Sequence, residues 1–574
     1  MVWRKIFMLN IVVLCACVSI VYPQQANITA RDIVYPIYAR NGMVVTSEPT
    51  ATEIGASILQ QGGNAVDAAV AVGFALAVTL PRAGNIGGGG FMMIYSADDG
   101  RVTAIDYREK APGRAHRDMY LDEDGHVDAE RVQYSHLASG VPGTVAGLAL
   151  ALETYGTMSL EQVITPAIEV TEEGFEVTPW FSEGIKYRAE RFRSHASTRE
   201  VFFKPDGSFY EPGDVFVQED LARMLRLIAR QGTDAFYRGE IADLITAEME
   251  RHGGWITKED LAAYRPAVRH PVSGTYRGYQ VFSMPPPSSG GVHIIQMLNI
   301  LEGFDLKALG HNTAATIHLM TETMKRAYAD RSRYLGDPDF VDVPVEGLMS
   351  KAYASTLREQ IDPSKVTPSQ DIAPGTPPGY ESPETTHFSI VDKDGNVVSN
   401  TYTINFSYGS GIVVQGAGFL LNNEMDDFSA KPGVPNDDGL IGADANAIVP
   451  NKRMLSSMTP TIVLKDGKPF LVTGSPGGSR IITTTLQVIL NVIDHGMNVQ
   501  EAVNAPRMHH QWLPDQIRME EGFSADTIHI LKSMGYDVIT GTAMGSTNSI
   551  LIDHQTGFLY GAVDPRRHGL AMGY

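Results

Sequence analysis

The chain has 574 residues, of which 43% are hydrophobic and 20% are charged, and its formal net charge is −20. This composition is typical of a soluble globular protein, and it excludes a disordered, collagen-like, coiled-coil or polytopic membrane chain. The negative charge is spread along the sequence without a basic patch, which argues against binding to nucleic acid or to an anionic membrane surface. The length predicts two or more structural units or one large composite fold.

The first residues have the pattern of a secretory signal. Two basic residues precede a mostly apolar run from Ile6 to Tyr22, and this run is marginal as a membrane anchor, which needs about 20 apolar residues. We expect residues 1–25 to be a cleaved signal peptide and the mature protein to be periplasmic or secreted. A retained anchor, or a lipid anchor at Cys17, is the alternative. Both cysteines of the chain, Cys15 and Cys17, lie in this segment, so the mature chain would have no disulfide, thiol nucleophile or cysteine metal site.

The first half of the chain is predicted to be mainly helical. One helix ends near Gln61, before two glycines, and residues 67–78 form a helix that is apolar on every face and therefore buried. Four glycines, Gly87 to Gly90, precede a predicted strand over 91–95. Because no Gly-Lys-Ser/Thr follows them, they indicate a close backbone approach rather than a phosphate-binding loop. Further helices are predicted over 145–155, 220–230 and 293–301.

The second half begins after a proline-rich stretch, residues 370–384, which predicts a loop or linker. Two hairpins follow, with strands over 386–391 and 397–405 and then over 459–464 and 469–473. A helix is predicted over 481–493. These elements predict a mixed α and β protein with antiparallel sheets. The adjacent pair His509-His510 is interpreted as structural, because neighbouring side chains on a regular element diverge and cannot share a metal ion.

The threonine-rich start of the second half is a candidate nucleophile. Taken alone, Thr385-Thr386-His387 is an ordinary strand start. A two- or three-residue turn at Asp394-Gly395, however, sets Thr385 opposite Thr403 or Ile404, where the two threonine hydroxyls can touch. A threonine nucleophile needs a base, and its own α-amino group can serve if the preceding peptide bond is cut. The proline-rich linker would allow such a cut without disrupting a helix or strand.

The loop Ser475-Pro476-Gly477-Gly478-Ser479 joins a predicted strand to a predicted helix. Two glycines there can expose backbone N–H groups at a helix N-terminus, which is the arrangement of an oxyanion hole. Taken alone, such a loop is more often a tight turn. The acidic segment 422–427, Arg108 and the pair Ser456-Ser457 are likewise unremarkable singly.

Together these segments resemble the γ-glutamyltransferases, also called γ-glutamyltranspeptidases or glutathione hydrolases, of the bacterial secreted type. The resemblance covers essentially the whole mature chain. Its motifs, in chain order, are Gly62–Ala69, Gly84–Phe91, Asp106–Glu109, Ser139–Gly143, Pro286–Gly291, Thr385–Ser389, Leu421–Phe428, Leu455–Pro460 and Gly474–Gly478.

The resemblance implies an α+β fold, the four-layer αββα sandwich of the N-terminal-nucleophile hydrolases. It implies an inactive precursor that cuts itself into a large subunit, residues 26–384, and a small catalytic subunit, residues 385–574, which remain together as a heterodimer. The new N-terminal threonine would attack the γ-amide of glutathione or another γ-glutamyl compound. Water, an amino acid or a peptide would then accept the γ-glutamyl group. No cofactor, metal ion or nucleic-acid partner is expected.

Carried over residue by residue, the resemblance gives each candidate a role. Thr385 matches the nucleophile and Thr403 the hydroxyl that contacts it. Gly477 and Gly478 match the oxyanion loop. The groups that match the binding site of the donor's α-carboxylate are Arg108, Ser456 and Ser457. The groups that match the binding site of its α-ammonium are Asn405, Glu424 and Asp427.

One departure and two alternatives accompany this interpretation. Lys431 to Ala443 resembles a lid loop, but Asp438 stands where some bacterial members have an aromatic residue. A related acylase or poly-γ-glutamate depolymerase of the same fold is one alternative, although Arg108 with Ser456-Ser457 favours an amino-acid head group. An uncleaved periplasmic binding protein for γ-glutamyl compounds is the alternative from another class.

Overall fold

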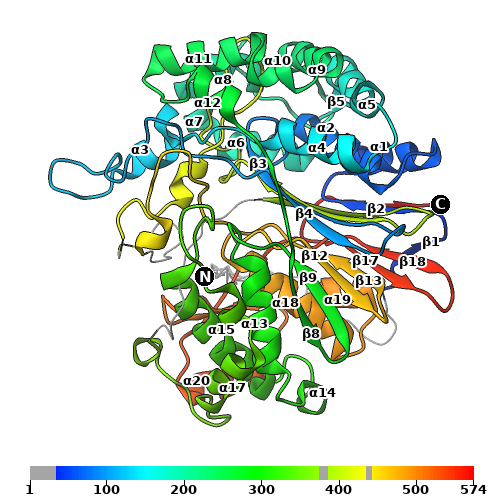
Figure 1. Cartoon of the computed structure of the whole chain (residues 1–574), viewed down its shortest axis with the longest axis vertical. Coiled ribbons are helices and arrows are strands. Elements are labelled where there is room, and N and C mark those ends of the chain that lie inside the picture. The colour runs from blue at the N-terminus through cyan, green and yellow to red at the C-terminus, as the bar shows by residue number, and fades with distance from the viewer. Residues whose placement is uncertain (1–33, 374–384, 433, 435–442) are drawn as a thin grey trace, which may run out of the picture. The chain divides into compact units, whose positions relative to one another are not determined.

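Two seven-stranded antiparallel sheets stand at the centre of residues 36–574 (Figure 1). The first sheet has the strand order β19 (Leu570–Gly573), β2 (Met43–Thr46), β10 (Thr386–Val391), β11 (Val397–Thr403), β3 (Gly89–Tyr95), β4 (Val102–Asp106) and β7 (Ala267–Arg269). The second sheet has the order β1 (Ile37–Ala39), β18 (Phe558–Ala562), β17 (Ser549–Asp553), β13 (Lys468–Thr473), β12 (Thr461–Lys465), β9 (Tyr279–Ser283) and β8 (Val272–Tyr276).

The computed structural model describes residues 34–373, 385–432, 434 and 443–574. The predicted signal peptide, Glu384 and Asp438 lie outside the described residues. Contacts divide the chain into residues 1–35 and residues 36–574, and the fold below is that of the second unit. This single unit corresponds to the composite-fold alternative of the sequence-based expectation.

Helices cover the outer face of each sheet (Figure 1). Those over the first sheet include α1 (Pro49–Gln60), α2 (Ala65–Thr79), α4 (Thr144–Tyr155), α5 (Leu160–Glu173) and α9 (Glu219–Gln231). Those over the second sheet include α13 (Gly290–Leu301), α15 (Ala314–Tyr334), α17 (Lys351–Glu359), α18 (Arg480–Ile493), α19 (Val499–Asn504) and α20 (Ala525–Met534). Every residue of α2 is buried, Asp67 and Thr79 included, as apolar residues on every face of this helix predict.

The remaining elements extend these helical layers. The helices are α3 (Ala129–Tyr134), α6 (Pro179–Tyr187), α7 (Ala189–Ser194), α8 (Ala196–Phe202), α10 (Thr233–Tyr237), α11 (Glu240–His252), α12 (Lys258–Ala263), α14 (Leu306–Leu309) and α16 (Val345–Leu348). Two small sheets contain β5 (Phe175–Glu176) with β6 (Val215–Phe216), and β14 (Met508–His509) with β15 (Ile517–Glu520) and β16 (Val538–Gly541). In the part of the chain that the structure describes, no helix has the length and apolar character needed to cross a bilayer.

Three apolar cores hold the layers together. One packs α1, α2 and α4 against the first sheet, and another packs α13, α15 and α18 against the second sheet. Between the two sheets lies a third core, which joins Phe91 and Val45 of the first sheet to Ile462, Val472 and Ile550 of the second. The predicted four-layer αββα sandwich is therefore confirmed.

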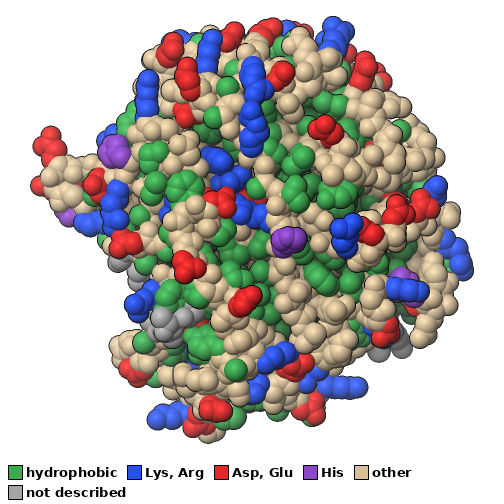
Figure 2. All heavy atoms as spheres, viewed as in Figure 1, with side chains coloured by type: hydrophobic (Ala, Val, Ile, Leu, Met, Phe, Trp, Pro, Cys, Tyr) green, Lys and Arg blue, Asp and Glu red, His purple; other side chains and the backbone are tan. Residues whose placement is uncertain are grey.

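Both predicted subunits contribute strands to each sheet. In the first sheet, β10 and β11, which follow residue 384, lie between β2 and β3, which precede it. In the second sheet, β9 pairs with β12 across the same boundary. The two parts of the chain thus share their hydrogen-bond ladders and cores. Figure 2 shows acidic and basic side chains interspersed over one face, in agreement with the spread of charge along the sequence.

The hairpin of β10 and β11 has the register of a three-residue turn. The Asp392 N–H donates to the Asn396 carbonyl at 3.1 Å, and Gly395 has a φ of 89°, the left-handed conformation that this turn requires. Thr386 pairs with Tyr402, so one further step along the ladder sets Thr385 opposite Thr403. Of the two partners predicted for Thr385, the structure selects Thr403.

The four consecutive glycines make close backbone contacts, as predicted. A Cβ atom on Gly88 would lie 2.1 Å from the Thr403 carbonyl oxygen, and one on Gly87 would lie 2.3 Å from the Leu420 carbonyl oxygen. Gly89 pairs directly with Thr403 in the ladder between β3 and β11. The glycines therefore bring β3 against the end of β11, where Thr403 lies.

We expect Gly88→Ala to destabilise the protein, because the added methyl group meets backbone atoms that cannot rotate away. The loss should be about 3 kcal/mol, the upper end for inserting a methyl group into a packed core. Thermal unfolding of the purified protein measures it. Gly347→Ala is the matched control, because no atom lies within 4 Å of a Cβ at Gly347. Equal melting temperatures for the two variants would contradict the close approach.

Candidate active site

Thr385 and Thr403 lie at the same end of the β10–β11 hairpin, the end away from its turn. Their exposed fractions are 3% and 2%. The Thr403 hydroxyl accepts a hydrogen bond from the Asn405 N–H at 2.7 Å. The Arg567 guanidinium donates to the Thr385 carbonyl oxygen at 3.4 Å. The structure thus brings the predicted nucleophile and its predicted hydroxyl partner together.

Asn85 fixes the backbone around Thr403. Its side-chain amide donates to the Thr403 carbonyl oxygen at 2.8 Å, and its side-chain oxygen accepts from the Gly88 N–H at 2.9 Å. The Thr144 hydroxyl donates to the same side-chain oxygen at 2.7 Å. Asn85 belongs to the glycine-rich motif, but sequence reasoning did not single it out, because the pairing with Thr403 spans more than 300 residues.

The loop with Gly477 and Gly478 joins β13 to α18. Gly477 has a φ of 128° and Gly478 a φ of 60°, conformations that other residues rarely adopt. Ser479 is the N-cap residue of α18. Its side chain makes no capping hydrogen bond, and its hydroxyl instead donates to the Gln511 side-chain oxygen at 2.9 Å. Amide groups at this helix N-terminus are therefore not satisfied by a side-chain cap, which favours a negative charge there.

The start of this loop packs against the hairpin. A Cβ atom on Gly474 would lie 2.5 Å from the His387 ring, which is two residues along β10 from Thr385. The Ser399 hydroxyl of β11 donates to the Thr473 carbonyl oxygen at 3.2 Å. The end of β13 thus lies against the hairpin that carries both threonines, and it directs the glycine loop to the same end of the sandwich.

Arg108 stands at the centre of a buried charged cluster. Its two terminal nitrogens donate to Glu424 and to Asp427, and its Nη1 lies 3.7 Å from Glu109. The same guanidinium donates to the carbonyl oxygens of Met454, at 3.3 Å, and Leu455, at 3.2 Å. All four charged side chains are almost fully buried. The cluster joins a group predicted to bind a carboxylate directly to two groups predicted to bind an ammonium.

Three carboxyl groups surround this one guanidinium, and burial opposes the ionisation of two of them. Burial raises the pKa of the Glu109 carboxyl to about 7, although Arg108 acts in the opposite direction. Burial also raises the pKa of the Glu424 carboxyl well above its usual range, and Glu109 and Asp427 raise it further. The cluster therefore attracts a positive charge, since a cation would stabilise the ionised carboxylates.

Ser456 and Ser457 lie next to the backbone that Arg108 contacts. The Ser456 N–H donates to the Pro287 carbonyl oxygen at 2.8 Å, and the Ser289 N–H donates to the Ser456 carbonyl oxygen at 2.7 Å. Arg331, a buried residue of α15, donates to the Ser457 hydroxyl at 3.3 Å and to the Ser289 hydroxyl at 3.0 Å. Sequence reasoning missed Arg331, because a single basic residue in a helix gives no signal of burial.

Asn405 connects the hairpin to the acidic segment. It has a φ of 69°, and its side-chain amide donates to the Asn423 carbonyl oxygen at 3.0 Å. Asn422 then accepts from the N–H groups of Gly140, at 2.8 Å, and Glu424, at 3.0 Å. Glu424 and Asp427 lie in a short 3-10 helix, Glu424–Asp427, that follows these asparagines. The acids are therefore held on a rigid segment and do not form the solvated turn that their composition alone suggests.

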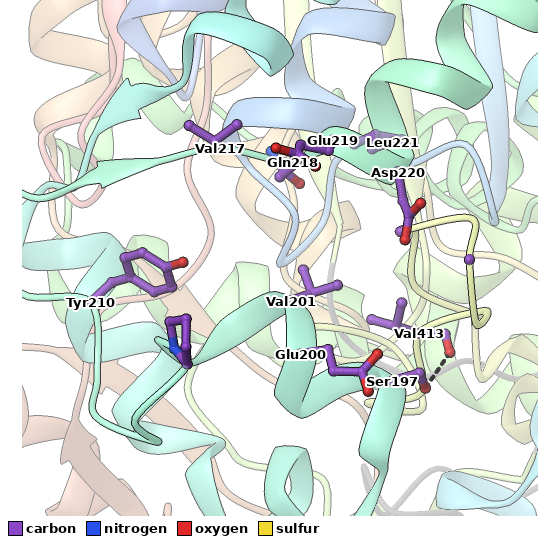
Figure 3. A pocket seen from close by; sticks show the side chains of 13 residues that line it. Ser197, Glu200, Val201, Tyr210, Val217, Gln218, Glu219, Asp220, Leu221 and Val413 are labelled. Carbon is purple, nitrogen blue, oxygen red and sulfur yellow. Dashed lines mark hydrogen bonds between the residues drawn. The ribbon is translucent and has the colours of Figure 1, made fainter.

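A pocket of about 450 Å³, drawn in Figure 3, lies elsewhere in the fold. It is bordered by α8, by the start of α9 and by the loop that contains Val413, Gly416 and Gly418. None of the residues predicted for the site lines it. The site is therefore recognised from its hydrogen bonds and ion pairs rather than from the size of a cavity.

The chain is similar to known proteins over most of its length. Residues 51–574 match the family model described as gamma-glutamyltranspeptidase. The chain is 57% identical over 546 residues to the glutathione hydrolase proenzyme of Escherichia coli (strain K12), and the match covers 95% of this chain and 94% of that protein.

Two solved structures are also similar. The crystal structure of cephalosporin acylase from Bacillus halodurans matches with a TM-score of 0.84 at 32% identity, covering 94% of this chain and 97% of that chain. The crystal structure of Helicobacter pylori gamma-glutamyltranspeptidase matches with a TM-score of 0.57 at 51% identity, covering 57% of this chain and 94% of that chain.

The raised pKa of Glu109 predicts a pH-dependent stability. As the pH rises from 4.5 to about 7, the unfolded chain loses this proton while the folded protein keeps it, so the free energy of unfolding falls. Glu109→Gln removes this dependence. We expect the wild type to lose on the order of 3 kcal/mol relative to the variant across that range, measured by thermal unfolding at several pH values. Glu53→Gln, at an exposed position of α1, is the control; if the pH profile of Glu109→Gln parallels that of the wild type, the raised pKa is refuted.

Proposed function

The chain belongs to the gamma-glutamyltranspeptidase family, and we propose that it is a precursor that cuts itself before Thr385 and then acts as a glutathione hydrolase and γ-glutamyltransferase. The proposed subunits are residues 26–384 and 385–574, after removal of a signal peptide, residues 1–25, on export to the periplasm or the medium. The observation that carries this proposal is the buried cluster of Arg108 with Glu424 and Asp427, next to the hairpin of Thr385 and Thr403.

The proposed self-cleavage uses the Thr385 hydroxyl as the nucleophile. Its oxygen attacks the carbonyl carbon of Glu384, the peptide C–N bond breaks, and the nitrogen becomes the free α-amino group of Thr385. Water then hydrolyses the resulting ester between Glu384 and the Thr385 side chain. The Thr403 hydroxyl, held by the Asn405 N–H, stands opposite Thr385 and is suited to contact the attacking oxygen.

The same hydroxyl then reacts with the donor. The Thr385 α-amino group accepts the hydroxyl proton while the oxygen attacks the γ-carbonyl carbon. The amide C–N bond breaks, the amine leaves with a proton, and a γ-glutamyl ester of Thr385 remains. Water or the amino group of an acceptor attacks this ester and regenerates the enzyme. We assign Gly477 and Gly478 to the developing oxyanion, because their loop leaves α18 without a side-chain cap.

The charged cluster suits the head group of a glutamyl donor. The α-carboxylate and the α-ammonium stand on one carbon atom, so their binding groups must be neighbours, and Arg108 contacts both Glu424 and Asp427. We assign Arg108, Ser456 and Ser457 to the carboxylate, and Asn405, Glu424 and Asp427 to the ammonium. Anchoring both charges would place the γ-carbonyl group at the threonine hydroxyl.

A related acylase is the second candidate, favoured by the match to the cephalosporin acylase structure. If the acyl group of the substrate had no α-ammonium, the buried carboxyl groups of Glu424 and Asp427 would have no group to bind except Arg108. The likeness to the proenzyme of Escherichia coli, at 57% identity, and the excess of carboxyl groups over basic groups in the cluster support the γ-glutamyl donor. An uncleaved binding protein would have no use for Thr385 opposite Thr403 or for the glycine loop at Gly477 and Gly478, and these features argue against it.

We expect the purified protein to consist of two fragments of about 360 and 190 residues, set by the position of Thr385 in the chain. Sequencing of the smaller fragment from its N-terminus should give Thr-Thr-His-Phe. Thr385→Ala should stay one chain and be inactive, because it lacks the nucleophile. Thr386→Ala is the matched control and should still be cut. A fragment that begins at any other residue would overturn the assignment of Thr385.

Two substitutions distinguish the ends of the donor pocket. A γ-glutaryl substrate keeps the carboxylate but lacks the α-ammonium. Arg108→Lys should lower kcat/KM about 10- to 150-fold for both γ-glutamyl and γ-glutaryl substrates, the effect of losing a charge-assisted contact worth roughly 1.5–3 kcal/mol. Asp427→Asn should penalise the γ-glutamyl substrate much more than the γ-glutaryl one.

Both variants should still be cut, since cleavage involves no free donor. Two fragments on a denaturing gel would show that each variant is cut and therefore folds. If Asp427→Asn affects both substrates equally, Asp427 is structural and the assigned polarity of the pocket is wrong.

A further inference from the structure

Outside the active site, three side chains bring metal-binding atoms together. His136 lies in a 3-10 helix, His136–Ala138, while Glu248 and His252 lie one turn apart on α11. One ligand atom from each of the three lies within 4.8 Å of the other two. The pair His509-His510, which the sequence analysis interpreted as structural, shows no such convergence, since His509 bonds to Thr483 and His510 to Asp515.

The distances in this cluster suit a small cation. The Glu248 Oε1 atom lies 3.0 Å from the His136 Nε2 atom and 3.5 Å from the His252 Nε2 atom. Ligand atoms around a tetrahedral ion with bonds of about 2.0–2.1 Å are about 3.3 Å apart, so modest side-chain rotations would complete the geometry. The two imidazole rings stack with their centroids 4.7 Å apart, and both Nε2 atoms face the same carboxylate oxygen.

The second oxygen of Glu248 is already engaged. Arg251 lies 3.2 Å from the Oε2 atom, and the Gln415 N–H donates to it at 3.4 Å. These contacts orient the carboxylate so that the Oε1 atom faces the two histidines, the kind of outer-shell support that metal ligands usually have. The Glu248 side chain is 3% exposed and the His252 side chain 50% exposed, so an ion can enter from the solvent past His252.

An ordinary buried ion pair would explain His136 and Glu248 but not the whole arrangement. The ion pair accounts for the contact of His136 with the Oε1 atom, whereas His252 brings a second imidazole nitrogen to the same oxygen, at 3.5 Å. Two neutral imidazoles and one carboxylate form the ligand set of many zinc sites with an open fourth position. We propose that His136, Glu248 and His252 bind one divalent transition-metal ion of the zinc class, with solvent as the fourth ligand.

The position of this site gives it a structural consequence. Three residues after His136, the Ser139 hydroxyl donates to the Asn422 carbonyl oxygen at 2.8 Å. Gln415 belongs to the loop that borders the pocket in Figure 3, where Ser197 donates to the Val413 carbonyl oxygen at 2.7 Å. A bound ion would therefore link α11 to the segment that supports Asn422, while the Gln415 N–H, which donates to Glu248, joins α11 to this loop. This inference does not depend on the proposed function.

The test is zinc binding by the purified protein, whether cut or uncut, prepared without a polyhistidine tag. After metal removal with a chelator and dialysis against Zn²⁺, elemental analysis should find one Zn²⁺ per protein molecule. Calorimetry on the metal-free protein should give the affinity for Zn²⁺. Co²⁺ in the same site should show the visible absorption of a tetrahedral ion, whereas Mg²⁺ and Ca²⁺ should not compete, because they prefer oxygen ligands.

His252→Gln is the informative variant, because its half-exposed side chain can be changed without disturbing the core. It should bind Zn²⁺ at least 10-fold more weakly, since even outer-shell changes cost 10- to 100-fold. His126→Gln, at an exposed histidine of another loop, should bind as the wild type does. The absence of stoichiometric Zn²⁺ in the wild type, or equal binding by His252→Gln and wild type, would refute the site.

Discussion

The antiparallel pairing of β10 with β11 positions the groups of the active site. Its register sets Thr385 opposite Thr403, and β3 then pairs with β11 so that Gly89 faces Thr403. A shift of one residue would turn every side chain of β10 to the other face of the sheet. That shift would remove Thr385 from the hydroxyl of Thr403 and place polar groups in the apolar core. The fold therefore specifies this register strongly, because both faces of the first sheet are buried.

The buried charged cluster depends on this framework. An isolated buried arginine would cost several kcal/mol, and its removal would leave uncompensated carboxyl groups. The cluster persists because two rigid segments deliver its partners, one held by Asn422 and the other by Asn446. Asn446 donates to the Asp427 carbonyl oxygen at 2.7 Å and accepts from the Leu455 N–H at 3.1 Å. Neutral amide side chains thus hold the charged groups in place without adding to the charge.

The sequence predicted what depends on local pattern and on short loops. The hairpin register to within one residue, the buried helix α2 and the close approach of the four glycines follow from turn chemistry, hydrophobic periodicity and the missing Cβ atoms. The pairing of Arg108 with Glu424 spans 316 residues, and that of Arg331 with Ser457 spans 126. Such contacts depend on how two sheets and two helical layers pack, and no periodicity encodes that. The cluster of His136 with Glu248 was missed for the same reason, since only Glu248 and His252 show a helical spacing.

The strands β10 and β11 follow residue 384, but they lie between β2 and β3, which precede it. This arrangement limits how the two proposed subunits could separate. Separating the two proposed subunits would require breaking the ladders of both sheets and exposing all three cores, which amounts to global unfolding. A cut at this position is then a nick in one cooperative structure rather than the formation of a reversible complex. Dilution would not dissociate the pair, and the two parts would not exchange between molecules. Once denatured, they would face a bimolecular refolding problem that the uncut chain never meets.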